Sequence, residues 1–113
     1  FQGEAATLAD WELHLSTLFP DTRLKQYVEV RTADAGPLST VRALASLWRG
    51  WLYSEQAQRA AEALVADMTA EQLAELRAAV PKQGMQATLH GKAIQPLCLE
   101  LVDIARHGLK EIA

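Results

Sequence analysis

The chain has 113 residues, of which half are hydrophobic and 22% are charged. This size and composition fit one folded domain and are too apolar for a disordered tail. Basic residues, 11 in all, are scattered among 14 acidic ones, so the concentrated positive surface of a nucleic-acid-binding protein is not expected. The longest apolar stretches fall far short of the roughly 20 residues that span a bilayer, and no membrane segment is expected.

Cys98 is the single cysteine, which excludes an internal disulfide and a multi-cysteine zinc site. A reducing cytoplasm is the expected location. Because Cys98 falls on the apolar side of a predicted helix, we interpret it as a buried structural thiol rather than a nucleophile. The chain begins at Phe1 without the pattern of a secretory signal, and we interpret this start as a cut.

The first predicted element is a helix over residues 8–18. Thr7 is a suitable N-cap with Asp10 three residues later, which is the spacing of a capping box. Apolar residues then recur at helical spacing, at Leu8, Trp11, Leu15 and Leu18. Pro20 cannot continue the helical hydrogen bonds, so the helix is expected to end beside it.

The apolar period changes to two between Arg23 and Arg31, which predicts one long strand. One face of this strand would carry Arg23, Lys25, Tyr27, Glu29 and Arg31. The other face would carry Leu24, Gln26, Val28 and Val30. We expect Val28 and Val30 to be buried under helices, with Glu29 and Arg31 on the opposite side.

Four more helices are predicted after a turn over residues 34–37. Ser39 or Thr40 would cap a helix that ends near Tyr53, and Ser54 would cap the next one. Large apolar residues on the first of these helices, including Trp48 and Trp51, are interpreted as core.

Thr69 opens a further capping box, and Pro81 is expected to stop the helix that follows it. Residues 82–92 are interpreted as loop or a brief extended piece, and Pro96 suits the first turn of a last helix. The predicted fold class is therefore α+β, mainly helical, with one long strand and about five helices.

The charged face of the strand is the candidate site. Glu29 supplies a hard carboxylate oxygen suited to Mg²⁺, and Arg31 would point the same way about 6.5 to 7 Å along the strand. A planar guanidinium can hold phosphate oxygens bidentately and neutralise charge that develops during phosphoryl transfer. The same alternation is also typical of a solvated edge strand, and spacing alone leaves both interpretations open.

Two runs of residues carry a resemblance to a known family. The run Asp10-Trp11-Glu12-Leu13-His14-Leu15-Ser16-Thr17-Leu18-Phe19-Pro20 is followed by Arg23-Leu24-Lys25, Tyr27, Glu29, Arg31 and Ala33-Asp34-Ala35-Gly36-Pro37. Together they resemble the C-terminal part of glutamate–cysteine ligases of the plant and proteobacterial type. A looser similarity extends over residues 43–53 and 105–109.

The resemblance implies a glutamine-synthetase-like fold, in which residues 1–37 form a catalytic-strand segment and residues 38–113 a helical segment of one larger catalytic domain. It implies that ATP phosphorylates the γ-carboxylate of glutamate and that the amine of cysteine displaces the phosphate. By the same resemblance Glu29 would bind Mg²⁺ and Arg31 would contact the transferring phosphoryl group. Arg23 and Lys25 are candidates for binding the nucleotide anion.

The sequence departs from the family pattern at Thr32, at Leu38-Ser39-Thr40 and at Ala45. The remaining metal and glutamate ligands would lie upstream, so the isolated chain is expected to be inactive. Two alternatives are a non-catalytic helical interaction module derived from the family, and a related glutamate ligase with a different amine acceptor. With partner strands absent, the strand edge is expected to promote self-association.

Overall fold

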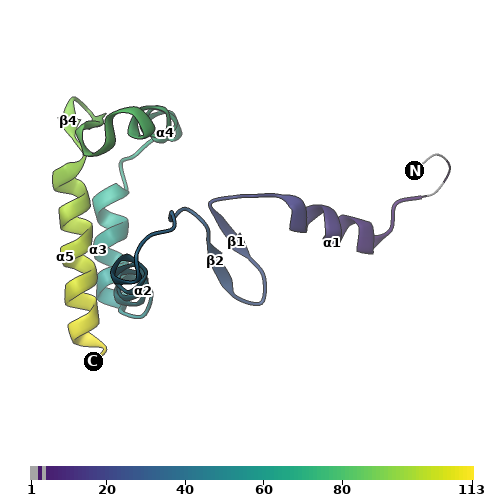
Figure 1. Ribbon diagram of the computed structural model, residues 1–113, viewed down its shortest axis with the longest axis horizontal. Helices are drawn as coiled ribbons and strands as arrows, with labels where there is room; N and C mark the ends of the chain where they lie inside the picture. The colour runs from purple at the N-terminus through teal and green to yellow at the C-terminus, as the bar shows by residue number, and fades with distance from the viewer. Residues whose placement is uncertain (1–2, 4) are drawn as a thin grey trace. The chain divides into compact units, whose positions relative to one another are not determined.

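The computed structural model describes residues 3 and 5–113. The chain divides into two units, of which the first ends at Ala35 and the second begins at Gly36. The described residues form five α-helices, one short 3-10 helix and two small antiparallel strand pairs (Figure 1). The predicted α+β class with mainly helical content is confirmed.

The first unit opens with α1 (Leu8–Thr17), within one residue of its predicted end. The capping box forms as expected. The Thr7 N–H donates to Asp10 Oδ2 at 2.8 Å, and the Asp10 N–H donates to Thr7 Oγ1 at 3.2 Å. No residue of α1 is buried, and Trp11 is 56% exposed, so the apolar side of this helix lies open in the chain.

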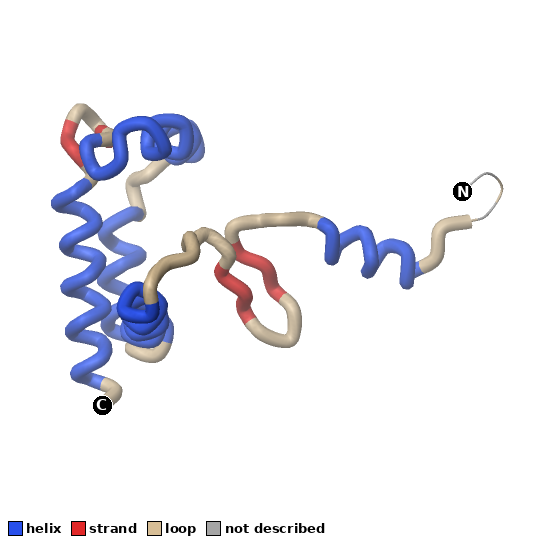
Figure 2. Tube along the Cα trace, in the orientation of Figure 1, coloured by secondary structure: helices blue, strands red, loops and turns tan. Residues whose placement is uncertain are grey.

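The predicted long strand is wrong, because residues 22–30 fold back as a hairpin (Figure 2). Strand β1 (Thr22–Leu24) pairs antiparallel with β2 (Val28–Val30), and Lys25 to Tyr27 form the turn. The Lys25 N–H donates to the Tyr27 carbonyl at 2.9 Å. Folding back gives backbone groups of both halves hydrogen-bond partners that a lone strand would lack.

The expected burial of the apolar strand face is also wrong. Val28 is 56% exposed, and Val30 is only half-buried. The sheet has two strands, so each apolar side chain meets few neighbours. A two-stranded hairpin cannot bury both faces without a further layer.

The second unit begins with α2 (Leu38–Leu52), which starts earlier than the predicted caps. Neither Ser39 nor Thr40 is the N-cap; Pro37 holds that position without a side-chain bond. The Pro37 carbonyl accepts from Thr40 N–H at 2.9 Å, so the first helical turn closes ahead of both hydroxyl residues. The predicted end near Tyr53 agrees with its position as C-cap.

Helices α3 (Glu55–Val65) and α5 (Gln95–Glu111) pack with α2 to form the core of this unit (Figure 1). Ser54 caps α3 as predicted, and Pro96 lies in the first turn of α5. Helices α2 and α5 cross with their backbones in contact. A Cβ on Gly50 would lie 2.1 Å from the Ala105 carbonyl oxygen.

Two tryptophans of α2 and the cysteine of α5 are half-buried. Trp48 and Trp51 meet edge to face, with ring centroids 5.1 Å apart, and both are half-buried. The Trp51 Nε1–H donates to the Leu101 carbonyl at 2.8 Å and ties α2 to α5. Cys98 on α5 is half-buried, so its thiol is less enclosed than the sequence predicted.

Helix α4 (Ala70–Gln83) opens with the predicted Thr69 capping box, but Pro81 does not stop it. Proline here removes one hydrogen bond in the last turn, and the helix continues to Gln83. It ends where Gly84 takes a positive φ of 55°, a conformation that glycine adopts without strain.

The segment after α4 contains η1 (Gly84–Gln86), β3 (Thr88–Leu89) and β4 (Lys92–Ala93). Strands β3 and β4 form a hairpin. Its two-residue turn consists of His90 and Gly91, which both have a positive φ. The hairpin agrees with the loop or brief extended piece predicted for residues 82–92, whereas residues 82–86 of that range are helical. Within the described residues, no helix has both the length and the apolar character needed to cross a membrane.

Candidate functional site

The hairpin register places Arg23 directly opposite Glu29. Arg23 Nε–H donates to Glu29 Oε2 at 2.9 Å, and Arg23 Nη2 lies 2.7 Å from the same oxygen. The turn of three residues keeps these two side chains on one face, because antiparallel partners point the same way. The site therefore combines residues from two short strands rather than from one long strand.

Arg31 completes the cluster from the end of β2. Its Nη1 lies 3.2 Å from Glu29 Oε1, the oxygen that Arg23 does not use. The guanidinium carbon of Arg31 lies 4.8 Å from the centre of the Phe19 ring, a cation–π contact that limits its movement. We call Arg23, Glu29 and Arg31 the Arg–Glu–Arg cluster.

Glu29 is held in its ionised form. The hydrogen bond from Arg23 is the main cause that lowers the pKa of its carboxyl group, and partial burial opposes this. The charges of Arg23, Arg31 and Lys25 lower the pKa further. Because two arginines contact this one carboxylate and Lys25 adds a more distant positive charge, the site as a whole attracts anions.

The donor set fits a metal ion that arrives with an anionic ligand. Oε1 of Glu29 accepts from Arg31, and a carboxylate oxygen can accept a second partner. Among the described residues, no group of three or more His, Cys, Asp or Glu side chains could hold a metal ion. Magnesium binds readily through one carboxylate when phosphate oxygens and waters supply its other ligands.

Lys25 and Tyr27 lie in the hairpin turn, apart from the cluster. Tyr27 is 64% exposed, and Lys25 influences Glu29 through charge rather than contact. The five residues predicted to share one strand face are therefore split between a cluster of three and an exposed turn. Lys25 also lines a hollow between α1 and β1, together with Arg23 and Leu15.

Two groups that contact the cluster, the Phe19 ring and the Ser16 carbonyl, could not be predicted from the alternating pattern of residues 23–31. Phe19 lies before Pro20 at the end of the α1 segment, and nothing in its spacing links it to Arg31. The Ser16 carbonyl accepts from Arg23 Nη1 at 2.9 Å, and backbone acceptors of this kind carry no residue-specific signal.

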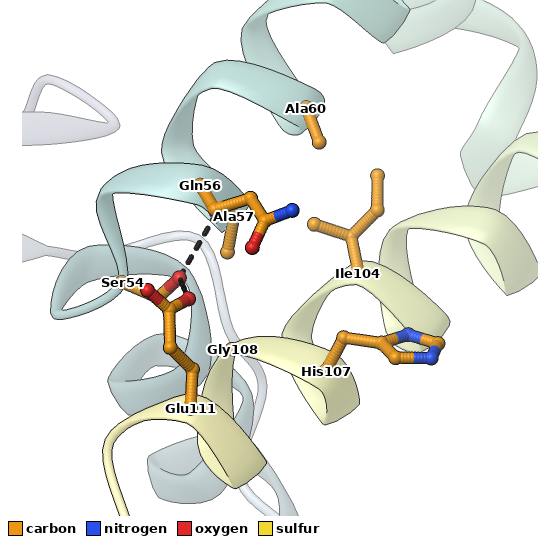
Figure 3. Close-up of a pocket in the computed structure, with 8 residues that line it drawn as sticks. All are labelled: Ser54, Gln56, Ala57, Ala60, Ile104, His107, Gly108 and Glu111. Carbon is orange, nitrogen blue, oxygen red and sulfur yellow. Dashed lines mark hydrogen bonds between the residues drawn. The ribbon is translucent and has the colours of Figure 1, made fainter.

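A second hollow lies between α3 and α5 in the other unit (Figure 3). Ser54, only 1% exposed, accepts from the Ala57 N–H at 3.0 Å and donates to the Glu111 carboxylate. His107 points away from Ser54, and its Nδ1–H donates to the Asp103 carbonyl at 2.8 Å. Ser54 therefore caps α3 and ties it to α5, and the arrangement does not form a nucleophile–base pair.

A sequence model of a known family matches residues 2–110, and it describes glutamate-cysteine ligase family 2 (GCS2). The match covers nearly all of the chain, including the hairpin and every helix of the core. The chain therefore belongs to the glutamate–cysteine ligase family 2.

Curated proteins that are similar to this chain carry the name of the same enzyme family. The chain is 38% identical over 108 residues to glutamate–cysteine ligase A, chloroplastic, of Oryza sativa subsp. indica. It is 40% identical over the same length to the chloroplastic enzyme of Solanum lycopersicum and 36% identical to that of Arabidopsis thaliana. Each alignment covers 96% of this chain but only 21 to 22% of the relative, so the chain spans about a fifth of their length.

Proposed function

We propose that this chain is part of an ATP-dependent ligase that joins the γ-carboxylate of glutamate to the amine of cysteine through a γ-glutamyl phosphate. Family membership and the names of the relatives support the ligase class and its place in glutathione biosynthesis. The observation that carries the proposal is the Arg–Glu–Arg cluster, which presents an ionised carboxylate beside a stacked guanidinium.

In this proposal Glu29 is a ligand of Mg²⁺, and Arg31 contacts the transferring phosphoryl group. Bound Mg²⁺ supplies charge neutralisation to the polyphosphate, while Arg31 offers hydrogen-bond donors fixed by Phe19. The positive charges of Lys25 and Arg23 add a potential that attracts ATP. We place the activity in the cytoplasm, whereas the relatives above are named as chloroplastic.

The isolated chain should bind Mg-ATP weakly and form no γ-glutamylcysteine. Glu29 is one carboxylate, and the described residues contain no cluster of three potential metal ligands. Both oxygens of that carboxylate already bind arginines, so this chain supplies too few free ligands to hold Mg-ATP tightly. Calorimetric titration of the chain with Mg-ATP tests this expectation, and micromolar binding by a monomer would contradict it.

The enzymatic proposal is tested in the complete ligase with Glu29→Gln. This change removes one ligand charge and keeps the shape, so turnover should fall at least tenfold and the Mg²⁺ concentration for half-maximal rate should rise. Glu55→Gln is a matched control, because Glu55 forms only an exposed helical ion pair with Arg59. Wild-type turnover and Mg²⁺ dependence in Glu29→Gln would contradict the assignment.

One observation favours a second candidate, a non-catalytic interaction module. Leu8 is 73% exposed and Trp11 is 56% exposed on a helix without buried residues. Such a surface promotes association with another chain. Absence of ligase activity in the complete protein, together with retained binding of a partner chain, would favour the module. A related ligase with a different amine acceptor is distinguished by assaying amines other than cysteine.

A further inference from the structure

We infer that the two arginines of the cluster have different tasks: Arg23 is a positioning residue that fixes Glu29 to the end of α1, and Arg31 alone contacts the nucleotide phosphate. This assignment deepens the proposed function and rests on it for its enzymatic consequence. It also revises the initial expectation that Arg23 binds the nucleotide.

The contacts of Arg23 engage all three nitrogens of its guanidinium. Nε and Nη2 both engage Oε2 of Glu29, at 2.9 and 2.7 Å. Nη1 donates to the carbonyls of Ser16 at 2.9 Å and Leu18 at 3.5 Å. The side chain is 15% exposed, and a phosphate that bound two nitrogens of the guanidinium would have to displace bonds that are already made.

The carbonyls of Ser16 and Leu18 explain why an arginine suits position 23. The last carbonyls of a helix lack partners within the helix, and they form the negative end of its dipole. One planar guanidinium can satisfy such an acceptor and hold a carboxylate at the same time, which an ammonium cannot do in the same geometry. Arg23 thus joins α1, β1 and β2 in a single network.

Arg31 is placed differently. In the part of the chain that the structure describes, its guanidinium pairs with Glu29 through Nη1 at 3.2 Å, while Nε and Nη2 make no hydrogen bond to protein. Its side chain is 27% exposed, and one face is covered by Phe19. A stacked guanidinium with unused edge donors is suited to binding phosphate in the ring plane.

The structural half is tested on the 113-residue chain by NMR of the arginine side chains. Arg23 Nε–H should exchange with water at least tenfold more slowly than Arg31 Nε–H, and its guanidinium rotation should be hindered. Arg23→Gln should shift the amide signals of residues 16–19, whereas Arg31→Gln should leave residues 16 and 17 unchanged. Equal exchange rates for both arginines, or an unperturbed end of α1 in Arg23→Gln, would overturn the positioning role.

The functional half is tested by steady-state kinetics of the complete ligase. Arg31→Gln should raise KM for ATP at least tenfold, whereas Arg23→Gln should lower kcat at least tenfold and change KM for ATP by less than threefold. Arg23→Lys should not restore kcat, because an ammonium cannot bridge both acceptors. An equal or larger rise of KM in Arg23→Gln would overturn the assignment. A wild-type protein without ligase activity would instead refute the proposed function, and the NMR result would still decide the structural half.

Discussion

Glu29 is the residue on which the site depends. Each of its two carboxylate oxygens faces a different arginine, at 2.7 Å for Arg23 and 3.2 Å for Arg31. The sequence predicts that Glu29 and Arg31, two residues apart, lie on the same side of the chain. The partner across the hairpin could not be predicted, because Arg23 reaches Glu29 only after the chain reverses at Lys25 to Tyr27.

Asp10 gives a pH-dependent prediction at the same scale. Hydrogen bonds from the Thr7 hydroxyl and N–H lower the pKa of the Asp10 carboxyl below its ordinary value of 3.8. A carboxyl with a lowered folded pKa stabilises the helix above the ordinary value, and this stabilisation is lost as the pH falls through the folded pKa. NMR secondary shifts of residues 8–11 should therefore lose helical character in acid, below about pH 4.

Thr7→Val is the matched variant for that titration. Valine keeps the branched shape and removes the hydroxyl that lowers the pKa of Asp10. The acid transition should move toward higher pH, and helicity of the first turn should be smaller at pH 7. An identical titration in both proteins would show that the capping box does not stabilise α1.

At the scale of elements, local signals account for what the sequence could predict. Thr7, Ser54 and Thr69 all cap the helices expected of them, because capping depends on residues three positions apart. The hairpin could not be predicted, because Lys25, Gln26 and Tyr27 include none of the usual turn residues. The expectation that Pro81 stops α4 is wrong, because a proline in the last turn removes only one hydrogen bond of the helix.

The crossing of α2 and α5 leads to a stability prediction. A Cβ at position 50 would lie 2.1 Å from the Ala105 carbonyl oxygen, and rigid backbone cannot move aside at low cost. Gly50→Ala should lower the free energy of unfolding by about 3 kcal/mol, at the upper end of overpacking effects. Urea denaturation measures this change.

Ser46→Ala is the control for that prediction. Ser46 lies on the same helix and is exposed, and alanine has the higher helix propensity, so this variant should be as stable as the parent or slightly more stable. Equal stability of Gly50→Ala and Ser46→Ala would contradict the close crossing of the two backbones.

At the scale of the whole molecule, the chain exposes more apolar surface than a protein with one large core. Only Ala57, Ala87, Ile94 and Ala105 are buried apolar residues in the described structure. The relatives are about five times longer, and the chain aligns with only a fifth of them. The sequence pattern predicts the apolar side of α1, but it could not show that this chain leaves that side uncovered.

We therefore expect the isolated chain to self-associate through the apolar side of α1. Trp11→Glu places a charge on the exposed ring position, so it should shift the sedimentation coefficient toward the monomer. Thr17→Glu adds the same charge to α1 without removing apolar surface and should leave association unchanged. A monomeric parent chain at high concentration would contradict this expectation.

We propose above that Arg31, held by Phe19 and Glu29, contacts the phosphoryl group in a ligase containing this chain. The most direct test compares kcat/KM for ATP in Arg31→Lys and Arg31→Ala of the complete enzyme, measured from the formation of γ-glutamylcysteine. A point ammonium cannot replace the planar fork, so both variants should lose at least a hundredfold in kcat/KM for ATP, and lysine should recover little. A kcat/KM for ATP at the parent value in Arg31→Ala would contradict this role of Arg31.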